Sequence, residues 1–223
     1  MPVPALALQS SRHDYLTYQM DDTIPNIREY LNGLRRKLGL AEDVPPPEPG
    51  SERKAAAVLM PLIERKEGLT LLYTRRSDRL VSHRGQVSFP GGRFDPRDPH
   101  LMAAALRETH EEVGIPPENI EVLGSFRGLR THSTDILVTP FVGVVHGSPE
   151  LRPDPKEVAE IFEVPLNALT DPRYRGYHKQ SDDRRAARYP AILYAGQVIW
   201  GLTYSLTLTF LELTGLARNK KRR

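Results

Sequence analysis

The sequence predicts an α+β fold, and two observations support this prediction. Apolar runs typical of strands and amphipathic stretches typical of helices follow one another without a regular strand–helix–strand repeat, which argues against a doubly wound parallel sheet. Hydrophobic residues make up 39% and charged residues 26% of the 223 residues, as is typical of a folded domain rather than of a disordered chain. This length suits one large domain, or one domain with an appendage.

The first 50 residues are expected to form a helical arm ahead of the main domain. Apolar residues recur there at three- and four-residue steps, which predicts an amphipathic helix over about residues 23–38 with Asp22 as its N-cap. The prolines within residues 45–50 predict a stiff linker. Because the helix could pack on its own domain or on a second subunit, a homodimer stays open.

The main domain is expected to span residues 51–216, followed by a basic, disordered tail over 217–223. Strands are predicted over residues 55–62, 69–74, 85–90, 120–127, 135–145, 157–164 and 191–199, and helices over 101–113 and 201–216. Asp98 and Pro99 are expected to begin the first of these helices, and Gly114 to end it.

The composition excludes several classes of protein. The absence of cysteine excludes disulfides, thiolate metal sites and cysteine nucleophiles, and it fits a reducing compartment. No apolar run approaches the roughly 20 residues of a membrane span, and the N-terminus lacks the charged region of a signal peptide. The formal net charge is +3, and much of the basic excess lies in the tail, where a frayed, solvated end is favoured over a nucleic-acid contact. We therefore expect a cytoplasmic protein with neither a nucleic-acid nor a membrane partner.

Three glutamates crowd one face of the helix predicted over residues 101–113. Since successive helical residues are about 100° apart, Glu108, Glu111 and Glu112 share a sector of roughly 100°. Such like charges destabilise a helix unless a cation lies among them, and Arg107 directly precedes them. Mg²⁺ and Mn²⁺ prefer oxygen ligands, and Mg²⁺ commonly links one or two carboxylates to substrate phosphates. The cluster predicts a divalent-metal site for phosphate chemistry, with a solvated charged face as the alternative.

The spacing around these glutamates resembles the Nudix box. That pattern is a Gly, five residues, a Glu, seven residues, and then Arg-Glu-apolar-any-Glu-Glu-any-Gly-apolar. Here Gly92 and five residues precede Asp98, and the run Arg107-Glu108-Thr109-His110-Glu111-Glu112-Val113-Gly114-Ile115 follows. Asp98 replaces the Glu, and eight residues rather than seven separate it from Arg107, so Asp98 is not counted among the ligands. The resemblance implies the Nudix fold, a mixed β-sheet sandwiched between α-helices.

An upstream block resembles the motif that marks coenzyme A pyrophosphatases within the Nudix family. It consists of Leu71-Leu72-Tyr73-Thr74-Arg75-Arg76-Ser77, then Arg79, Leu80, His83 and Gly85, and finally Phe89-Pro90-Gly91-Gly92. The resemblance implies hydrolysis of coenzyme A or its derivatives to 3′,5′-ADP and 4′-phosphopantetheine with Mg²⁺ or Mn²⁺. A Nudix hydrolase of another nucleoside diphosphate derivative, and a nucleotide sensor that cleaves nothing, are the rival interpretations.

Roles follow for individual residues as hypotheses. Glu108 and Glu112 are the expected metal ligands, and Glu111 is either a third ligand or the base that takes a proton from the attacking water. Glu157 is a further candidate base with Glu160 beside it, an ordinary strand-edge carboxylate being the alternative.

Arg107 is a further catalytic candidate. It is expected to hold a carboxylate by paired hydrogen bonds, or else to form a surface ion pair.

Glycines and a basic stretch are expected to bind the substrate. Gly91 and Gly92 allow close approach of a ligand to the backbone. A basic stretch suits the 3′-phosphate of coenzyme A, unless it is merely a solvated loop; its members are Arg75, Arg76, Arg79, His83 and Arg84.

Overall fold

The structure is a computed structural model, and it describes residues 26–41, 44, 54–80, 82–131, 134–179 and 187–216. The expected cap at Asp22, the linker over residues 45–50 and the tail over 217–223 lie outside these residues. The division of the chain into arm, domain and tail therefore stays a prediction.

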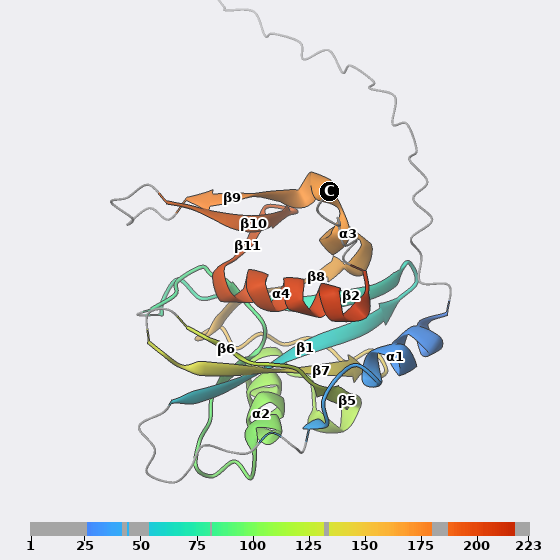
Figure 1. Cartoon of the computed structure of the whole chain (residues 1–223). Helices are drawn as coiled ribbons and strands as arrows, with labels where there is room; N and C mark the ends of the chain where they lie inside the picture. The colour runs from blue at the N-terminus through green and yellow to red at the C-terminus, as the bar shows by residue number, and fades with distance from the viewer. Residues whose placement is uncertain are drawn as a thin grey trace, which may run out of the picture.

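A mixed eight-stranded sheet forms the centre of the molecule (Figure 1). Its strands are β1 (Ala55–Arg65), β2 (Gly68–Arg76), β3 (Val87–Ser88), β4 (Gly91–Arg93), β5 (Ile120–Ser125), β6 (Leu129–Arg130), β7 (Leu137–Val145) and β8 (Val158–Pro165). The path β3-β2-β1-β7-β5 is joined by β4 on β1, β6 on β7 and β8 on β2. The pair β1–β7 is parallel and all the others are antiparallel, which confirms the expected mixed sheet.

Helices cover both faces of this sheet, as expected. The helices are α1 (Ile27–Arg35), α2 (Leu101–Val113), the short α3 (Leu166–Thr170) and α4 (Gly201–Thr214), with single 3₁₀ turns at Pro117–Asn119 and Pro172–Tyr174. One buried core lies between the sheet and α2, and it includes Leu59, Leu72 and Ala105. The other lies between the sheet and α4, where Tyr73 and Phe210 are completely buried. The alternation of side chains along each strand separates the two cores.

The N-terminal helix packs on its own domain. It begins later than expected, because Asn26 caps it by accepting a hydrogen bond from the N–H of Glu29 at 3.1 Å. Leu34 and Leu38 join the core that contains α4, and Gly39 pairs with Ser125 at the end of β5. These contacts attach α1 to the main sheet, while a homodimer stays a prediction.

A second, three-stranded sheet lies beyond α4, and it corrects one expected strand. The single strand expected over residues 191–199 is instead a hairpin of β10 (Arg188–Tyr194) and β11 (Gln197–Trp200), with β9 (Arg175–Lys179) on its other side. The turn consists of Ala195 and Gly196, both with positive φ, the backbone that two-residue hairpins require. Among the helices of the described residues, none has the length and hydropathy needed to cross a bilayer.

Candidate active site

A glycine turn lies against the carboxylates of α2. Gly91 begins β4 with φ 147°, and a Cβ atom there would lie 2.3 Å from the carbonyl oxygen of Ala57 in β1. A Cβ atom on Gly92 would lie 2.4 Å from Cδ of Glu108. Both distances are shorter than any real contact, so only glycine allows β4 to pair with β1 while the helix carboxylate rests on the backbone.

Glu112 is the most deeply buried of the three glutamates. It is 3% exposed, and its Oε2 accepts a hydrogen bond from the N–H of Gly91 at 3.2 Å. Its Oε1 lies 3.9 Å from Nη1 of Arg76. Burial raises the pKa of Glu112 to about 8, and the charges of Glu108 and Glu157 add to this rise. The hydrogen bond from Gly91 and the charge of Arg76 oppose it only in part.

Glu108 lies beside Glu112 and is also withdrawn from water. Burial raises its pKa, and the hydrogen bond from Arg107 opposes that shift. The charges of Glu111 and Glu157 raise it further. The half-buried Glu108 and the buried Glu112 therefore repel each other when both are charged.

Arg107 holds three carboxylates at once. Its Nε and Nη2 donate to the two oxygens of Asp98 at 2.9 and 3.0 Å, and its Nη1 donates to Glu108 at 2.9 Å and to Glu111 at 3.0 Å. The expected paired hydrogen bonds of Arg107 are thus present, and their partner is the buried Asp98. Glu111 remains exposed on the outer side of this cluster, and its roles as ligand or base stay predictions.

The range predicted for α2 is confirmed, but its predicted cap lies two residues too early. His100 caps the helix by accepting from the N–H of Ala103 at 3.0 Å, and the helix begins at Leu101 rather than Pro99. Asp98 is free to bond Arg107 because it lies just before the cap. The sequence held no signal for this, since the eight-residue spacing pointed away from Asp98. At the other end, Gly114 has φ 78° and terminates α2 as expected.

The two candidate bases outside α2 lie in different places. Glu157 is exposed, and its negative charge is among the causes that raise the pKa of Glu108 and of Glu112. Glu160 lies apart, where it accepts from Arg75 at 3.3 Å and from Gln197 of the second sheet at 2.9 Å. This arrangement favours Glu157 over Glu160 as the base, which stays a prediction.

The basic stretch is divided by the alternation of β2. Arg76 follows Leu72 and Thr74 on the face toward α2, whereas Arg75 lies on the opposite face and pairs with Glu160 and Asp78. Arg79, His83 and Arg84 are exposed in the loop that follows. Arg76 was predicted only as one of this stretch, and counting by twos from the buried Leu72 would have placed it beside Glu112.

The residues present fit a divalent cation through two carboxylates. Among the described residues, no three His, Asp or Glu side chains come together as a metal-holding group. Glu112 is nevertheless buried and Glu108 half-buried, the charge of Glu108 raises the pKa of Glu112, and one or two carboxylates suffice for Mg²⁺ when waters and substrate phosphates complete its shell. Glu108 and Glu112 as the ligands of that cation stay a prediction.

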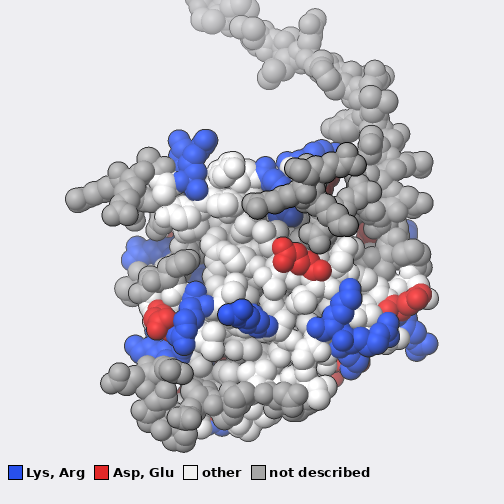
Figure 2. Space-filling model, in the orientation of Figure 1, with Lys and Arg blue, Asp and Glu red and all other residues white. Residues whose placement is uncertain are grey.

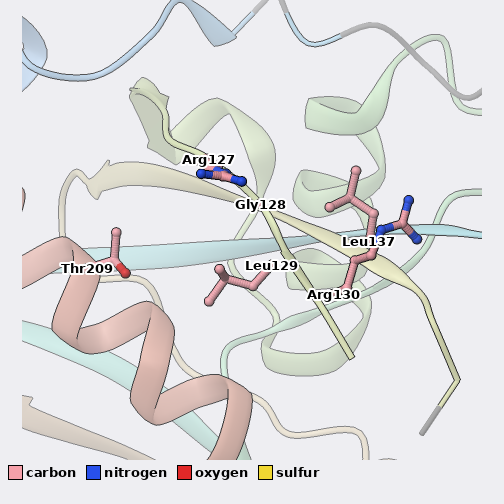
Figure 3. Close-up of a pocket in the computed structure, with 6 residues that line it drawn as sticks. All are labelled: Arg127, Gly128, Leu129, Arg130, Leu137 and Thr209. Carbon is pink, nitrogen blue, oxygen red and sulfur yellow. The ribbon is translucent and has the colours of Figure 1, made fainter. Parts of the chain in front are cut away.

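A hollow of about 530 Å³ lies elsewhere, between β6 and α4 (Figure 3). Its lining comprises Arg127, Gly128, Leu129, Arg130, Leu137 and Thr209. None of these residues is a carboxylate, so the hollow offers no metal ligands.

On the face drawn in Figure 2, basic side chains form separate groups rather than the continuous stripe that nucleic-acid binding calls for.

Comparisons with known proteins match this chain to one family. The sequence model of the NUDIX domain family matches residues 53–184. The uncharacterized Nudix hydrolase NudL of Photorhabdus laumondii is 44% identical over 184 residues, which cover 81% of this chain and 94% of the relative. NudL of Pectobacterium atrosepticum is 42% identical over 163 residues, which cover 71% and 81%. The solved structure of RenU, a Nudix hydrolase from M. smegmatis, aligns with a TM-score of 0.48 and 19% identity over 76% of this chain and 91% of that chain.

Proposed function

This chain belongs to the Nudix family, and from this premise we propose that it hydrolyses the pyrophosphate bond of coenzyme A or its derivatives. As a Nudix hydrolase it acts on a nucleoside diphosphate derivative. The proposed products are 3′,5′-ADP and 4′-phosphopantetheine or its acyl form, and the proposed cofactor is Mg²⁺ or Mn²⁺. The lack of cysteine supports the cytoplasm as the proposed location.

One observation supports the chemistry above all others. Glu112 is a buried carboxylate and Glu108 a half-buried one, both lie against a glycine turn, and Arg107 donates a hydrogen bond to Glu108. A cation bound there supplies Lewis-acid polarisation of a phosphoryl oxygen. The choice of coenzyme A among pyrophosphate substrates depends on the sequence block from Leu71 to Gly92 and on the exposed cations within it.

Other residues of the chain are proposed to bind the substrate and to activate the attacking water. Gly91 and Gly92 let the backbone of β4 lie close to β1 and to Glu108, and their proposed contact with the substrate rests on the sequence resemblance. Glu157 takes a proton from the water whose oxygen bonds to phosphorus, while the bridging P–O bond breaks; Glu111 is the alternative base. Arg79, His83 and Arg84 are exposed and can reach a 3′-phosphate, with Arg75 at their edge.

Product identification on a substrate panel tests this proposal. The purified protein is incubated with Mg²⁺ or Mn²⁺ and coenzyme A, acetyl-coenzyme A, dephospho-coenzyme A, ADP-ribose or a dinucleoside polyphosphate. We expect 3′,5′-ADP from coenzyme A, and a lower kcat/KM for the dephospho form. Faster cleavage of ADP-ribose or of the dinucleoside polyphosphate would replace the substrate assignment, and binding without turnover of any of them would favour the nucleotide sensor.

A further inference from the structure

A short segment that contains Glu157 forms hydrogen bonds with the end of α2 and with the residue just past the end of β2. We call it the bridging segment, residues 152–158. On one side it caps α2, since the N–H of Arg152 donates to the carbonyl of Val113 at 2.9 Å and the N–H of Asp154 donates to the carbonyl of Glu112 at 3.1 Å. On the other side, the carbonyl of Glu157 accepts from the N–H of Ser77 at 2.8 Å, just past the end of β2.

Asp154 holds the two sides of the bridging segment together. Its carbonyl accepts from the N–H of Glu157 at 3.0 Å and from the N–H of Val158 at 2.7 Å. Its Oδ1 accepts from the N–H of Lys156 at 2.9 Å, which closes the turn through Pro155. A continuous series of hydrogen bonds therefore leads from the backbone of the metal ligand Glu112, through Asp154, to the backbone of Glu157.

The close packing of this segment on α2 explains a glycine of the helix end. A Cβ atom on Gly114 would lie 3.1 Å from Cβ and 3.2 Å from the backbone nitrogen of Arg152. The positive φ of Gly114 turns the chain away from α2, and its missing side chain lets Arg152 approach the last helical carbonyls. The segment that contains Glu157 is thus anchored on the same helix that carries Glu108 and Glu112.

We propose that Asp154 is a positioning residue, which fixes the backbone of Glu157 relative to the helix of Glu108 and Glu112 by closing the turn of the bridging segment on α2. Asp154 acts through the backbone and does not touch the reacting atoms. This inference rests on the proposed role of Glu157 in hydrolysis, and it names the residue on which that role depends. The side-chain oxygen is the part that matters, because Asn keeps this acceptor and Ala removes it.

A double-mutant cycle between Asp154 and Glu157 tests the inference. We expect Asp154→Ala to lower kcat about tenfold with KM nearly unchanged, because the base of such a reaction contributes on the order of 10²- to 10⁴-fold and here is displaced rather than removed. Asp154→Asn should keep at least about half of kcat. In a Glu157→Gln background, Asp154→Ala should lower kcat no further.

The chain supplies a matched control for the loss of such a turn. Asp171 precedes Pro172 and accepts from the N–H of Arg173 at 2.8 Å in the same way, at the start of a 3₁₀ turn that leads into the second sheet. Asp171→Ala also removes the ion pair with Arg173, so it should lower the melting temperature at least as much as Asp154→Ala does, while leaving kcat unchanged. An equal loss of kcat in both variants would mean that Asp154 acts through general stability, and would overturn the inference.

A readout without substrate separates this inference from the proposed function. Titration with Mn²⁺ in a calorimeter should show the same few-fold loss of affinity in Glu157→Gln and Asp154→Ala, since Glu157 acts on both metal carboxylates. Asp171→Ala should bind Mn²⁺ like the wild type. If coenzyme A is not cleaved, the substrate proposal fails while this titration still decides the role of Asp154. If Asp154→Ala lowers kcat or Mn²⁺ affinity further in the Glu157→Gln background, the inference about Asp154 is wrong.

Discussion

The glutamates of α2 and the basic stretch over residues 75–84 are both dense runs of like charge, yet the fold treats them in opposite ways. The glutamates stay together, and Arg107 and the glycine turn hold two of them in one site. The basic residues separate: Arg76 faces Glu112, Arg75 faces Glu160 on the other side of the sheet, and the rest are exposed in a loop. A helix brings residues three and four apart onto one face, whereas a strand sends neighbours to opposite faces. Density of charge in a sequence therefore predicts a site on a helix far better than on a strand.

Glu112→Gln is expected to have the largest effect on activity. The amide keeps the acceptor for the N–H of Gly91 but removes a charge from the metal site. We expect kcat to fall by roughly 10²-fold or more, with far-ultraviolet circular dichroism unchanged. Activity within tenfold of the wild type would show that the helix glutamates are not the centre of the chemistry.

The same substitution is expected to stabilise the protein without metal. The pKa of Glu112 is raised to about 8 from an ordinary value of 4.5, so folding takes up a proton at intermediate pH. The native state therefore loses stability as pH rises from 4.5 toward 8, by up to a few kcal/mol. In EDTA, the melting temperature of Glu112→Gln should exceed that of the wild type by an amount that grows over this range. A difference that is constant with pH would contradict the burial of a charged Glu112.

Arg107→Ala should destabilise the domain by about 2 kcal/mol, because the buried Asp98 loses its bidentate partner. The hydrogen bonds from Arg107 lower the pKa of Asp98 below its ordinary value of 3.8. Their contribution is complete above that value and is lost as pH falls through the lowered pKa. Urea unfolding at pH 7 and pH 3 measures this, and the difference from the wild type should shrink at pH 3. Arg107→Lys should recover only part of the loss, since an ammonium cannot pair with both oxygens in one plane.

Arg79→Ala and Arg84→Ala test the exposed part of the basic stretch. Each should raise KM for coenzyme A several-fold and leave KM for dephospho-coenzyme A unchanged, because a solvated cation contributes on the order of 1 kcal/mol to binding a phosphate. Equal effects on both substrates would remove the 3′-phosphate from this loop. The measurement would then sharpen the contrast with α2, whose carboxylates affect every substrate.

Arg65→Ala should have the smallest effect and serves as a control outside both regions. Arg65 pairs with Glu163 through two hydrogen bonds, and Thr70 also donates to Glu163 at 2.6 Å. Because this pair is partly exposed, its loss should cost less than about 1 kcal/mol and leave kcat/KM unchanged. A large loss of activity would mean that charge anywhere on β1 or β8 reaches the site.

The sequence predicted most elements of the fold, because their signals are local. The apolar periodicity and Gly114 placed α2 at residues 101–113, and the spacing of its glutamates followed from the helical repeat alone. The strand predicted over residues 191–199 failed because Ala195-Gly196 is a weak turn signal inside an apolar run. The predicted cap of α2 was wrong because His100, an uncommon capping residue, accepts the hydrogen bond expected of Asp98.

The sequence by itself therefore determined the helix with the three glutamates, its glycine turn and the family to which they belong. Only the tertiary structure decided which carboxylates are buried, which arginine faces them, and that Asp98 holds Arg107. It also decided that residues 152–158 cap α2 and join it to the end of β2. The reason is physical: a helical repeat fixes angles between residues close in the chain, whereas burial, pKa and pairing depend on which distant strands and loops pack against that helix.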